Sequence, residues 1–172
     1  TEGRVVFSRT DRLDAAAGEP GEPRLLSAEQ SNASVAFSDR LILKLYRRLR
    51  EGVQPDIEVA RFLTEETDFD ATPRLLGTID WIGPDGEVTT LAAASEFVRN
   101  QGDAWSYATE ALDRDMERLE LEDGEAEATS PMGGPLDLGA VLGRRTAELH
   151  RALSSGQGAF GTEPLTGDRL AG

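Results

Sequence analysis

The chain has 172 residues and no cysteine, which excludes disulfide bonds and thiolate metal sites. It also lacks a long apolar run: none approaches the ~20 residues of a membrane-spanning helix. The N-terminus shows no signal-peptide pattern. Basic residues are few, with 18 against 32 acidic ones and a net charge of -14. Because nucleic acids and anionic membranes bind basic surfaces, neither is an expected partner. From the lack of cysteine we expect a cytoplasmic protein.

The residue combinations of common hydrolases and metalloenzymes are missing too. The sequence offers no metal cluster, no Cys/His pair and no Ser-His-Asp set, and His150 is its single histidine. This histidine lies in RRTAELHRAL, whose apolar spacing predicts a helix. Packing or surface hydrogen bonding is the favoured role for His150 over catalysis.

Apolar residues make up 38% of the chain and charged residues 29%, values typical of a globular protein. Residues 10–23 are predicted to form an exposed loop, and Ser38-Asp39-Arg40 and Pro84-Asp85-Gly86 are turn signals. Each turn joins two strands into a hairpin. The predicted strands are 4–8, 24–29, 33–37, 41–46, 74–82 and 87–98.

Three helices are predicted from capping residues and apolar spacing. Pro55 suits the first turn of a helix over 55–66, while Asp103 and Asp137 are expected to cap helices that run to about 121 and 154. The acidic segment 122–135 is interpreted as a flexible spacer, in preference to a regulatory segment. Strands followed by one helix, a hairpin and further helices predict an α+β fold with an antiparallel sheet.

One lysine stands in the middle of the apolar strand LILKLY, and this position needs an explanation. A polar turn precedes it in SAEQSNASVAF, and a helix with an acidic first turn follows. This is the order of a protein-kinase-like N-lobe, in which a turn covers ATP phosphates, a strand lysine holds them and a helix glutamate pairs with that lysine. In the alternative interpretation, Lys44 lies at a strand edge or reaches solvent, and Glu58 is simply solvated.

Five segments in this order resemble the bacterial maltokinases, including the maltokinase region fused to trehalose synthase. They are SAEQSNASVAF, RLILKLYRRL, PDIEVARFLTE, SEFVRNQGDAWSYATEAL and LGRRTAELHRAL. The family is related to aminoglycoside-phosphotransferase-like kinases. The resemblance implies transfer of the ATP γ-phosphate to the anomeric hydroxyl of maltose, giving maltose 1-phosphate for α-glucan synthesis. It also implies ATP and Mg²⁺ as cofactors, with trehalose synthase as a fused or bound partner.

The resemblance further implies roles for individual residues. The EQSN-type turn resembles a substitute for the glycine-rich loop of protein kinases, Lys44 would bind the α- and β-phosphates, and Glu58 would pair with Lys44. The segment 96–98 matches a hinge whose backbone would bind adenine. Gln101, Gly102, Asp103 and Trp105 would begin the connection to a second lobe, and for Trp105 and Tyr107 interlobe packing and a substrate role stay open. The full set of nucleotide-binding candidates is Ser31, Asn32, Ser34, Lys44, Glu58, Glu96, Phe97 and Val98.

A kinase of this type also needs a catalytic aspartate, an asparagine and a metal-binding aspartate. These are expected after residue 154, but residues 155–172 contain Asp168 without such a motif. We therefore expect an N-lobe over 1–98 and a hinge with helical linker over 99–172, in a fragment with no catalytic residue or metal ligand and no activity alone. Two alternatives stay open: a kinase for another sugar such as glucosamine, and a non-catalytic interaction module derived from such a kinase.

Overall fold

The computed structural model describes residues 2–16, 21–28, 32–121 and 133–163. By its internal contacts the chain divides into two compact units, Thr1–Arg99 with Ala152–Gly172, and Asn100–Arg151. The functional division between 1–98 and 99–172 stays a prediction.

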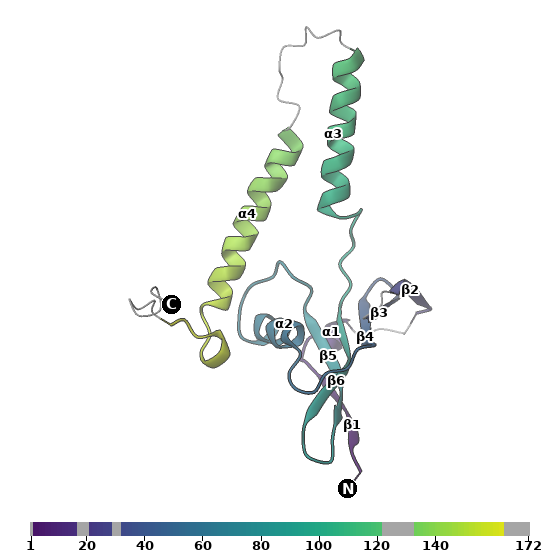
Figure 1. Cartoon of the computed structure of the whole chain (residues 1–172), viewed down its shortest axis with the longest axis vertical. Helices are drawn as coiled ribbons and strands as arrows, with labels where there is room; N and C mark the ends of the chain where they lie inside the picture. The colour runs from purple at the N-terminus through teal and green to yellow at the C-terminus, as the bar shows by residue number, and fades with distance from the viewer. Residues whose placement is uncertain (1, 17–20, 29–31, 122–132, 164–172) are drawn as a thin grey trace. The chain divides into compact units, whose positions relative to one another are not determined.

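The first unit is built on one six-stranded sheet with the order β1-β5-β6-β4-β3-β2, in which every neighbouring pair is antiparallel (Figure 1). The predicted α+β class with an antiparallel sheet is confirmed. The strands are β1 (Arg4–Arg9), β2 (Pro23–Ala28), β3 (Asn32–Phe37), β4 (Leu41–Tyr46), β5 (Leu75–Ile82) and β6 (Val88–Glu96).

The segment between β1 and β2 differs from the predicted loop, because it contains one helical turn, α1 (Leu13–Ala16). Thr10 explains why the chain turns here. Its buried hydroxyl donates a 2.7 Å hydrogen bond to the carbonyl of Leu75, and its own carbonyl accepts the N–H of Leu13 at 3.2 Å. The chain is therefore fixed against β5 as it leaves β1.

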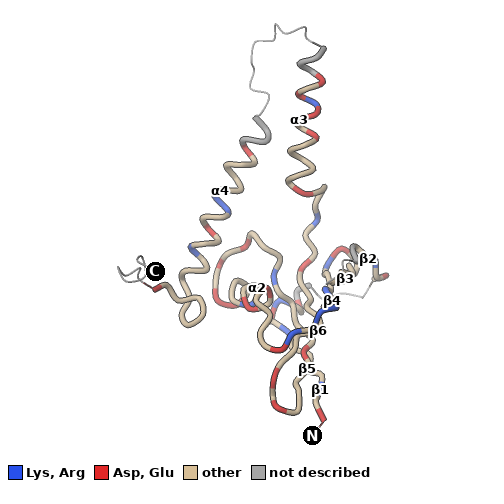
Figure 2. Tube along the Cα trace, in the orientation of Figure 1, with Lys and Arg blue, Asp and Glu red and all other residues tan. Residues whose placement is uncertain are grey.

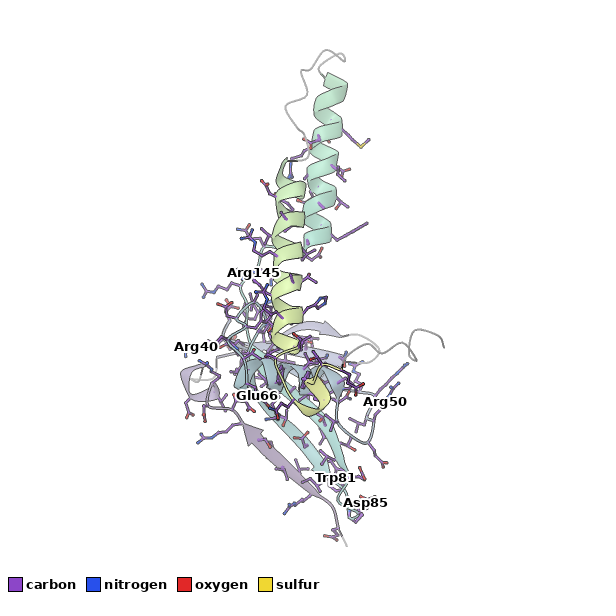
Figure 3. The ribbon with its side chains drawn as sticks, turned by 90° about the vertical axis from the view of Figure 1, so that its left-hand side faces the viewer. Arg40, Arg50, Glu66, Trp81, Asp85 and Arg145 are labelled. Carbon is purple, nitrogen blue, oxygen red and sulfur yellow. The ribbon has the colours of Figure 1, made fainter. Side chains whose placement is uncertain are left out.

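Both predicted turns form hairpins. Between β3 and β4, Ser38 and Asp39 adopt φ values of 50° and 49°, and the N–H of Arg40 bonds the carbonyl of Phe37 at 3.0 Å. Two successive residues with positive φ are typical of a type I′ turn, whose twist matches the flanking strands. Between β5 and β6, Gly86 supplies a φ of 91°. Figure 3 labels Trp81 and Asp85 near this second turn.

Helix α2 (Pro55–Glu65) covers one face of the sheet, as its predicted range 55–66 anticipated (Figure 1). Its Ile57 joins Leu75 and Ala93 in a buried cluster, against which Tyr46 and Ala60 pack. Pro55 occupies the first turn, where a missing N–H costs nothing. The apolar side of the helix therefore provides the contact that holds it to β4, β5 and β6.

The last turn of α2 is tied to β5 and to the segment after α4. The hydroxyl of Thr64 accepts the N–H of Leu75 at 2.9 Å, and Arg74 donates to the carbonyl of Leu63 at 2.8 Å. The ring of Phe62 stacks on Phe160, which belongs to the 3₁₀ helix η1 (Gly158–Phe160). The C-terminal end of α2 thus has three independent attachments.

The second unit contains α3 (Ala104–Leu121) and most of α4 (Gly133–Leu153). Asp103 caps α3 as predicted, because its Oδ1 accepts the N–H of Ser106 at 2.8 Å. The predicted start of α4 at Asp137 is wrong. The helix begins at Gly133, and Pro135 fits within its first turn, where proline is tolerated. Of the predicted acidic spacer, residues 122–132 lie outside the described part of the chain.

Acidic positions occur on both units, as Figure 2 shows, in agreement with the net charge of -14. Within the described ranges, no helix is long and apolar enough to cross a membrane.

Candidate functional site

Lys44 lies on an interior strand of the sheet and not at an edge. Strand β4 pairs with β3 on one side and β6 on the other, which places Ser34 and Ala93 directly opposite Lys44. Residues opposite each other in an antiparallel pair point to the same face of the sheet. Since Ala93 packs with Ile57 of α2, Lys44 shares the face that α2 covers.

The carboxylate that reaches Lys44 belongs to Asp56. The distance from Lys44 Nζ to Asp56 Oδ2 is 3.0 Å. The predicted partner, Glu58, is therefore wrong for this structure. Residues two positions apart on a helix point about 200° away from each other, so Asp56 and Glu58 cannot face the same lysine.

Glu58 instead lines a cavity of about 380 Å³ together with residues of α2, β5 and β6. Arg61 and Asp80 line the same cavity, where Asp80 Oδ2 accepts a 2.6 Å hydrogen bond from the hydroxyl of Thr78. The cavity thus combines both signs of charge. Phe160 closes part of its wall beside Phe62.

Tyr46 is a member of the site that the sequence interpretation did not include. Its hydroxyl donates a 2.7 Å hydrogen bond to Asp56 Oδ2, the same oxygen that Lys44 binds. The Lys44 ammonium also lies 5.1 Å from the centroid of the Tyr46 ring. A signal was present in the sequence, because residues two apart on a strand share a face.

Contacts among the three side chains shift the pKa values of Asp56 and Tyr46. Partial burial of Asp56 acts to raise its pKa, but hydrogen bonds from Tyr46 and Lys44, together with the positive charge of Lys44, lower that pKa below its usual value. The pKa of Tyr46 is raised by burial first, and then by its hydrogen bond to Asp56 and the negative charge of that carboxylate. Asp56 is therefore an anion, and Tyr46 a neutral donor, across the ordinary pH range.

The ion pair is too exposed to contribute much to folding. The side chains of Lys44 and Asp56 are 38% and 47% exposed. Pairs of this kind typically contribute ~0–1 kcal/mol to stability. A charge in the middle of an apolar strand thus has little stabilising value, which favours a role in binding.

Polar residues of β3 continue the site beside Lys44. Ser34 lies opposite Lys44, and Asn32 lies opposite Tyr46, so all four share one face. Both residues belong to strand β3 itself and not to the turn before it. Ser31 lies outside the described residues. One lysine with neighbouring hydroxyl and amide groups can donate hydrogen bonds to phosphate oxygens.

The predicted hinge 96–98 begins with Glu96, which is the last residue of β6. The N–H of Glu96 bonds the carbonyl of Arg74 at 3.0 Å, and the N–H of Phe97 bonds the carbonyl of Arg40 at 2.8 Å. These two donors are therefore used within the chain. An adenine ring bound here would need other backbone groups of the segment 96–98.

Residues predicted to begin the connection to a second lobe lie in the second unit. There, Gln101, Gly102 and Asp103 line an open cavity of about 620 Å³ together with Tyr107 and residues of α4. Trp105 does not line it and is 79% exposed. The hydrogen bond from the N–H of Ser106, ahead of a small opposing effect of burial, lowers the pKa of Asp103. His150 is exposed near the end of α4.

Within the described ranges, no group of three or more His, Cys, Asp or Glu side chains could hold a metal ion. Asp56 Oδ2 already accepts two hydrogen bonds, from Lys44 and Tyr46.

Comparison with known protein families finds no match. Among solved structures, the chain is similar to "Glucosamine kinase (crystal form B)", with 24% identity and a TM-score of 0.57 over 97% of this chain and 36% of that chain. It is also similar to "Glucosamine kinase in complex with glucosamine, ADP and inorganic phosphate", with 23% identity and a TM-score of 0.56 over 88% and 32% of the two chains. The likeness confirms the predicted kinase-like fold. The chain spans about a third of the length of these proteins.

Proposed function

We propose that the chain is the ATP-binding N-lobe portion of a sugar kinase. The observation that carries the proposal is the position of Lys44, on an interior strand, paired with a carboxylate of the covering helix and opposite Ser34. Structural similarity to glucosamine kinases supports the sugar-kinase class. One of them is a complex with ADP, which supports nucleotide binding.

In this proposal Lys44 binds the α- and β-phosphates while Asp56 orients its ammonium. Lys44 is the only lysine of the chain, so no other lysine competes for this role. Asn32, Ser34 and the preceding turn with Ser31 donate hydrogen bonds to phosphate oxygens. Backbone groups of Glu96, Phe97 and Val98 bind adenine. The cofactor is ATP with Mg²⁺, whose ligands we assign to another part of the whole enzyme.

Maltose is the proposed acceptor sugar, on the strength of the five segments that resemble maltokinases, and maltose 1-phosphate is then the product. Trehalose synthase is the partner that this assignment implies. Glucosamine is the second candidate, because both similar structures are glucosamine kinases. The two assignments share the nucleotide site and differ in residues that contact the sugar.

Binding of nucleotide tests the first part of the proposal. Calorimetric titration of the 172-residue chain with ADP and Mg²⁺ is expected to show one site, which Lys44→Met weakens at least tenfold. Arg9→Met is the matched control, because Arg9 is an exposed strand cation on β1, away from this site, and should leave the affinity unchanged. Absence of binding, or equal effects of the two variants, would favour a non-catalytic interaction module.

Because Lys44 is the sole lysine, covalent labelling gives an independent test. An adenosine that carries an electrophilic sulfonyl fluoride is expected to modify Lys44, and excess ADP should protect it. Peptide mass spectrometry then identifies the site. Modification of the N-terminal amine alone would contradict the proposed position of the nucleotide.

The acceptor sugar requires the enzyme that contains this chain. ADP release is measured with maltose or glucosamine as acceptor, and ³¹P NMR identifies the product. We expect an anomeric phosphate on maltose. Turnover with glucosamine alone would replace the maltose assignment and keep the sugar-kinase class. The absence of turnover with any sugar would reject both the maltose assignment and the sugar-kinase class.

A further inference from the structure

Tyr46 has a contact that packing alone does not explain. Its ring packs against the buried cluster of Ile57, Leu75 and Ala93, as an apolar residue could. Its hydroxyl, however, reaches Asp56 Oδ2 at 2.7 Å, in the first turn of α2. A phenylalanine would fill the same space without this hydrogen bond.

We propose that Tyr46 is a positioning residue for nucleotide phosphates: its hydroxyl holds the Asp56 carboxylate, and through it the Lys44 ammonium, at the sheet face beside Ser34. The inference rests on the proposed nucleotide-binding function. Tyr46 itself makes no contact with the nucleotide in this arrangement.

The geometry explains why a second donor is needed. The Asp56 side chain is 47% exposed, so water competes for its oxygens and its rotamer is weakly fixed by packing. The Lys44 side chain has a flexible four-carbon stem, and ordering it costs conformational entropy. Tyr46 comes from the sheet and is partly buried, so its hydroxyl has a fixed position. It therefore orders Asp56 before the nucleotide arrives.

A single oxygen of Asp56 accepts the hydrogen bonds of both Lys44 and Tyr46, and the Lys44 ammonium has further donors for a ligand. Asp56 Oδ2 accepts from Tyr46 at 2.7 Å and from Lys44 at 3.0 Å. An ammonium has three donors, so Lys44 can keep Asp56 and still donate to two phosphate oxygens. If Lys44 turns toward the phosphates, the hydroxyl of Tyr46 still satisfies Asp56. The elevated pKa of Tyr46 agrees with a hydroxyl that remains protonated beside the carboxylate.

Tyr46→Phe tests the proposal, because it removes the hydroxyl and keeps the ring. Tyr107→Phe is the matched control, since Tyr107 is the other tyrosine of the chain and lies in the second unit. ADP affinity is expected to fall about two- to tenfold in Tyr46→Phe, the range of one net hydrogen bond. The control should not change it. In the enzyme that contains the chain, KM for ATP should rise more than kcat falls.

A double-mutant cycle separates positioning from structural damage. If Tyr46 acts through Lys44, Tyr46→Phe should have little further effect on ADP affinity in the Lys44→Met background. Additive losses would show that Tyr46 acts by another route and would overturn the proposal.

The lone lysine provides a readout that does not depend on activity. With ¹³C-labelled lysine, the Cε group of Lys44 gives a single side-chain signal. Tyr46→Phe is expected to shift this signal and increase its mobility, measured by ¹³C relaxation, and Asp56→Asn should do the same with the tyrosine intact. An unchanged signal in Tyr46→Phe would overturn the proposal.

The outcomes distinguish this inference from the function on which it rests. If Lys44→Met weakens ADP binding and Tyr46→Phe does not, only the positioning role fails. If Lys44→Met leaves ADP affinity unchanged, the proposed nucleotide site fails, and the positioning role fails with it.

Discussion

The rings of Phe62 and Phe160 stack with centroids 4.1 Å apart and 12° between their planes. Phe62 belongs to α2, which carries Asp56, and Phe160 belongs to η1, the short helix after α4. The contact joins two segments that are far apart in the sequence. It supports the helix that supplies the partner of Lys44.

Loss of this stack should weaken the first unit. We expect Phe160→Ala to lower the free energy of unfolding by about 1–3 kcal/mol, from lost ring contact and partial exposure of Phe62. Phe7→Ala is the control, because Phe7 is 75% exposed on β1 and its removal should change little. Urea denaturation measures both, and equal values would show that the stack does not contribute.

Alanine substitutions at two glycines are expected to change the stability of the chain in opposite directions. A Cβ on Gly156 would lie 2.7 Å from ring atoms of Phe62, so Gly156→Ala should destabilise the chain. Gly139 in α4 has no atom within 4 Å of that position, so Gly139→Ala should stabilise the helix by ~0.5–1 kcal/mol. Thermal unfolding compares the variants, and a stabilising Gly156→Ala would mean that α2 and η1 can separate without cost.

The β3–β4 turn should accept a stabilising change. Ser38 and Asp39 both hold positive φ, which asparagine and glycine adopt at less cost. The double substitution Ser38→Asn and Asp39→Gly is therefore expected to gain about 1 kcal/mol. The loss of the exposed Arg24–Asp39 ion pair should offset little of this. Gly86→Ala, at a φ of 91°, should instead lower stability. If the double variant gains no stability, strain at the β3–β4 turn is excluded.

Asp56 predicts a specific dependence of stability on pH. Its pKa is lowered in the folded chain, so the unfolded chain binds a proton first as the pH falls. The contribution of Asp56 is present above its unfolded value, near 3.8, and is lost as the pH falls through the lower folded value. The stability difference between the native chain and Asp56→Asn should therefore be constant at neutral pH and shrink below about pH 4. A difference that stays constant into the acid range would contradict the lowered pKa.

Much of the sheet could be predicted from the sequence, because each strand carries its own signal. The short apolar run LILKLY predicts the strand at 41–46, and the turn residues after Phe37 and Ile82 fix the hairpins. Helix α2 was equally clear, since Pro55 marks its start. Helix α4 was less clear, because the capping signal at Asp137 competes with Pro135, which is the third residue of the helix.

The partner of Lys44 could not be predicted in the same way. Which carboxylate faces the strand depends on the rotation of α2 about its axis, and one residue changes that direction by about 100°. The rotation is set by Ile57 and Ala60 packing on Leu75 and Ala93, which are distant in sequence. The contact of Tyr46 with Asp56 depends on the same packing. The N–H partners of Glu96 and Phe97 likewise depend on the register of β6 against its neighbours.

The two residues of the ion pair are held to different degrees. Lys44 belongs to a strand that lies between two others, and Asp56 belongs to the start of a helix. Hydrogen bonds to β3 and β6 hold the backbone of Lys44 on both sides. Asp56 lies in the first turn of α2, where the N-cap residue Gln54 makes no side-chain capping hydrogen bond. Fraying of that first turn therefore carries Asp56 away from Lys44 and breaks the pair. Any ligand that favours the closed pair also lengthens the folded part of α2, and any change that unwinds this turn releases the lysine.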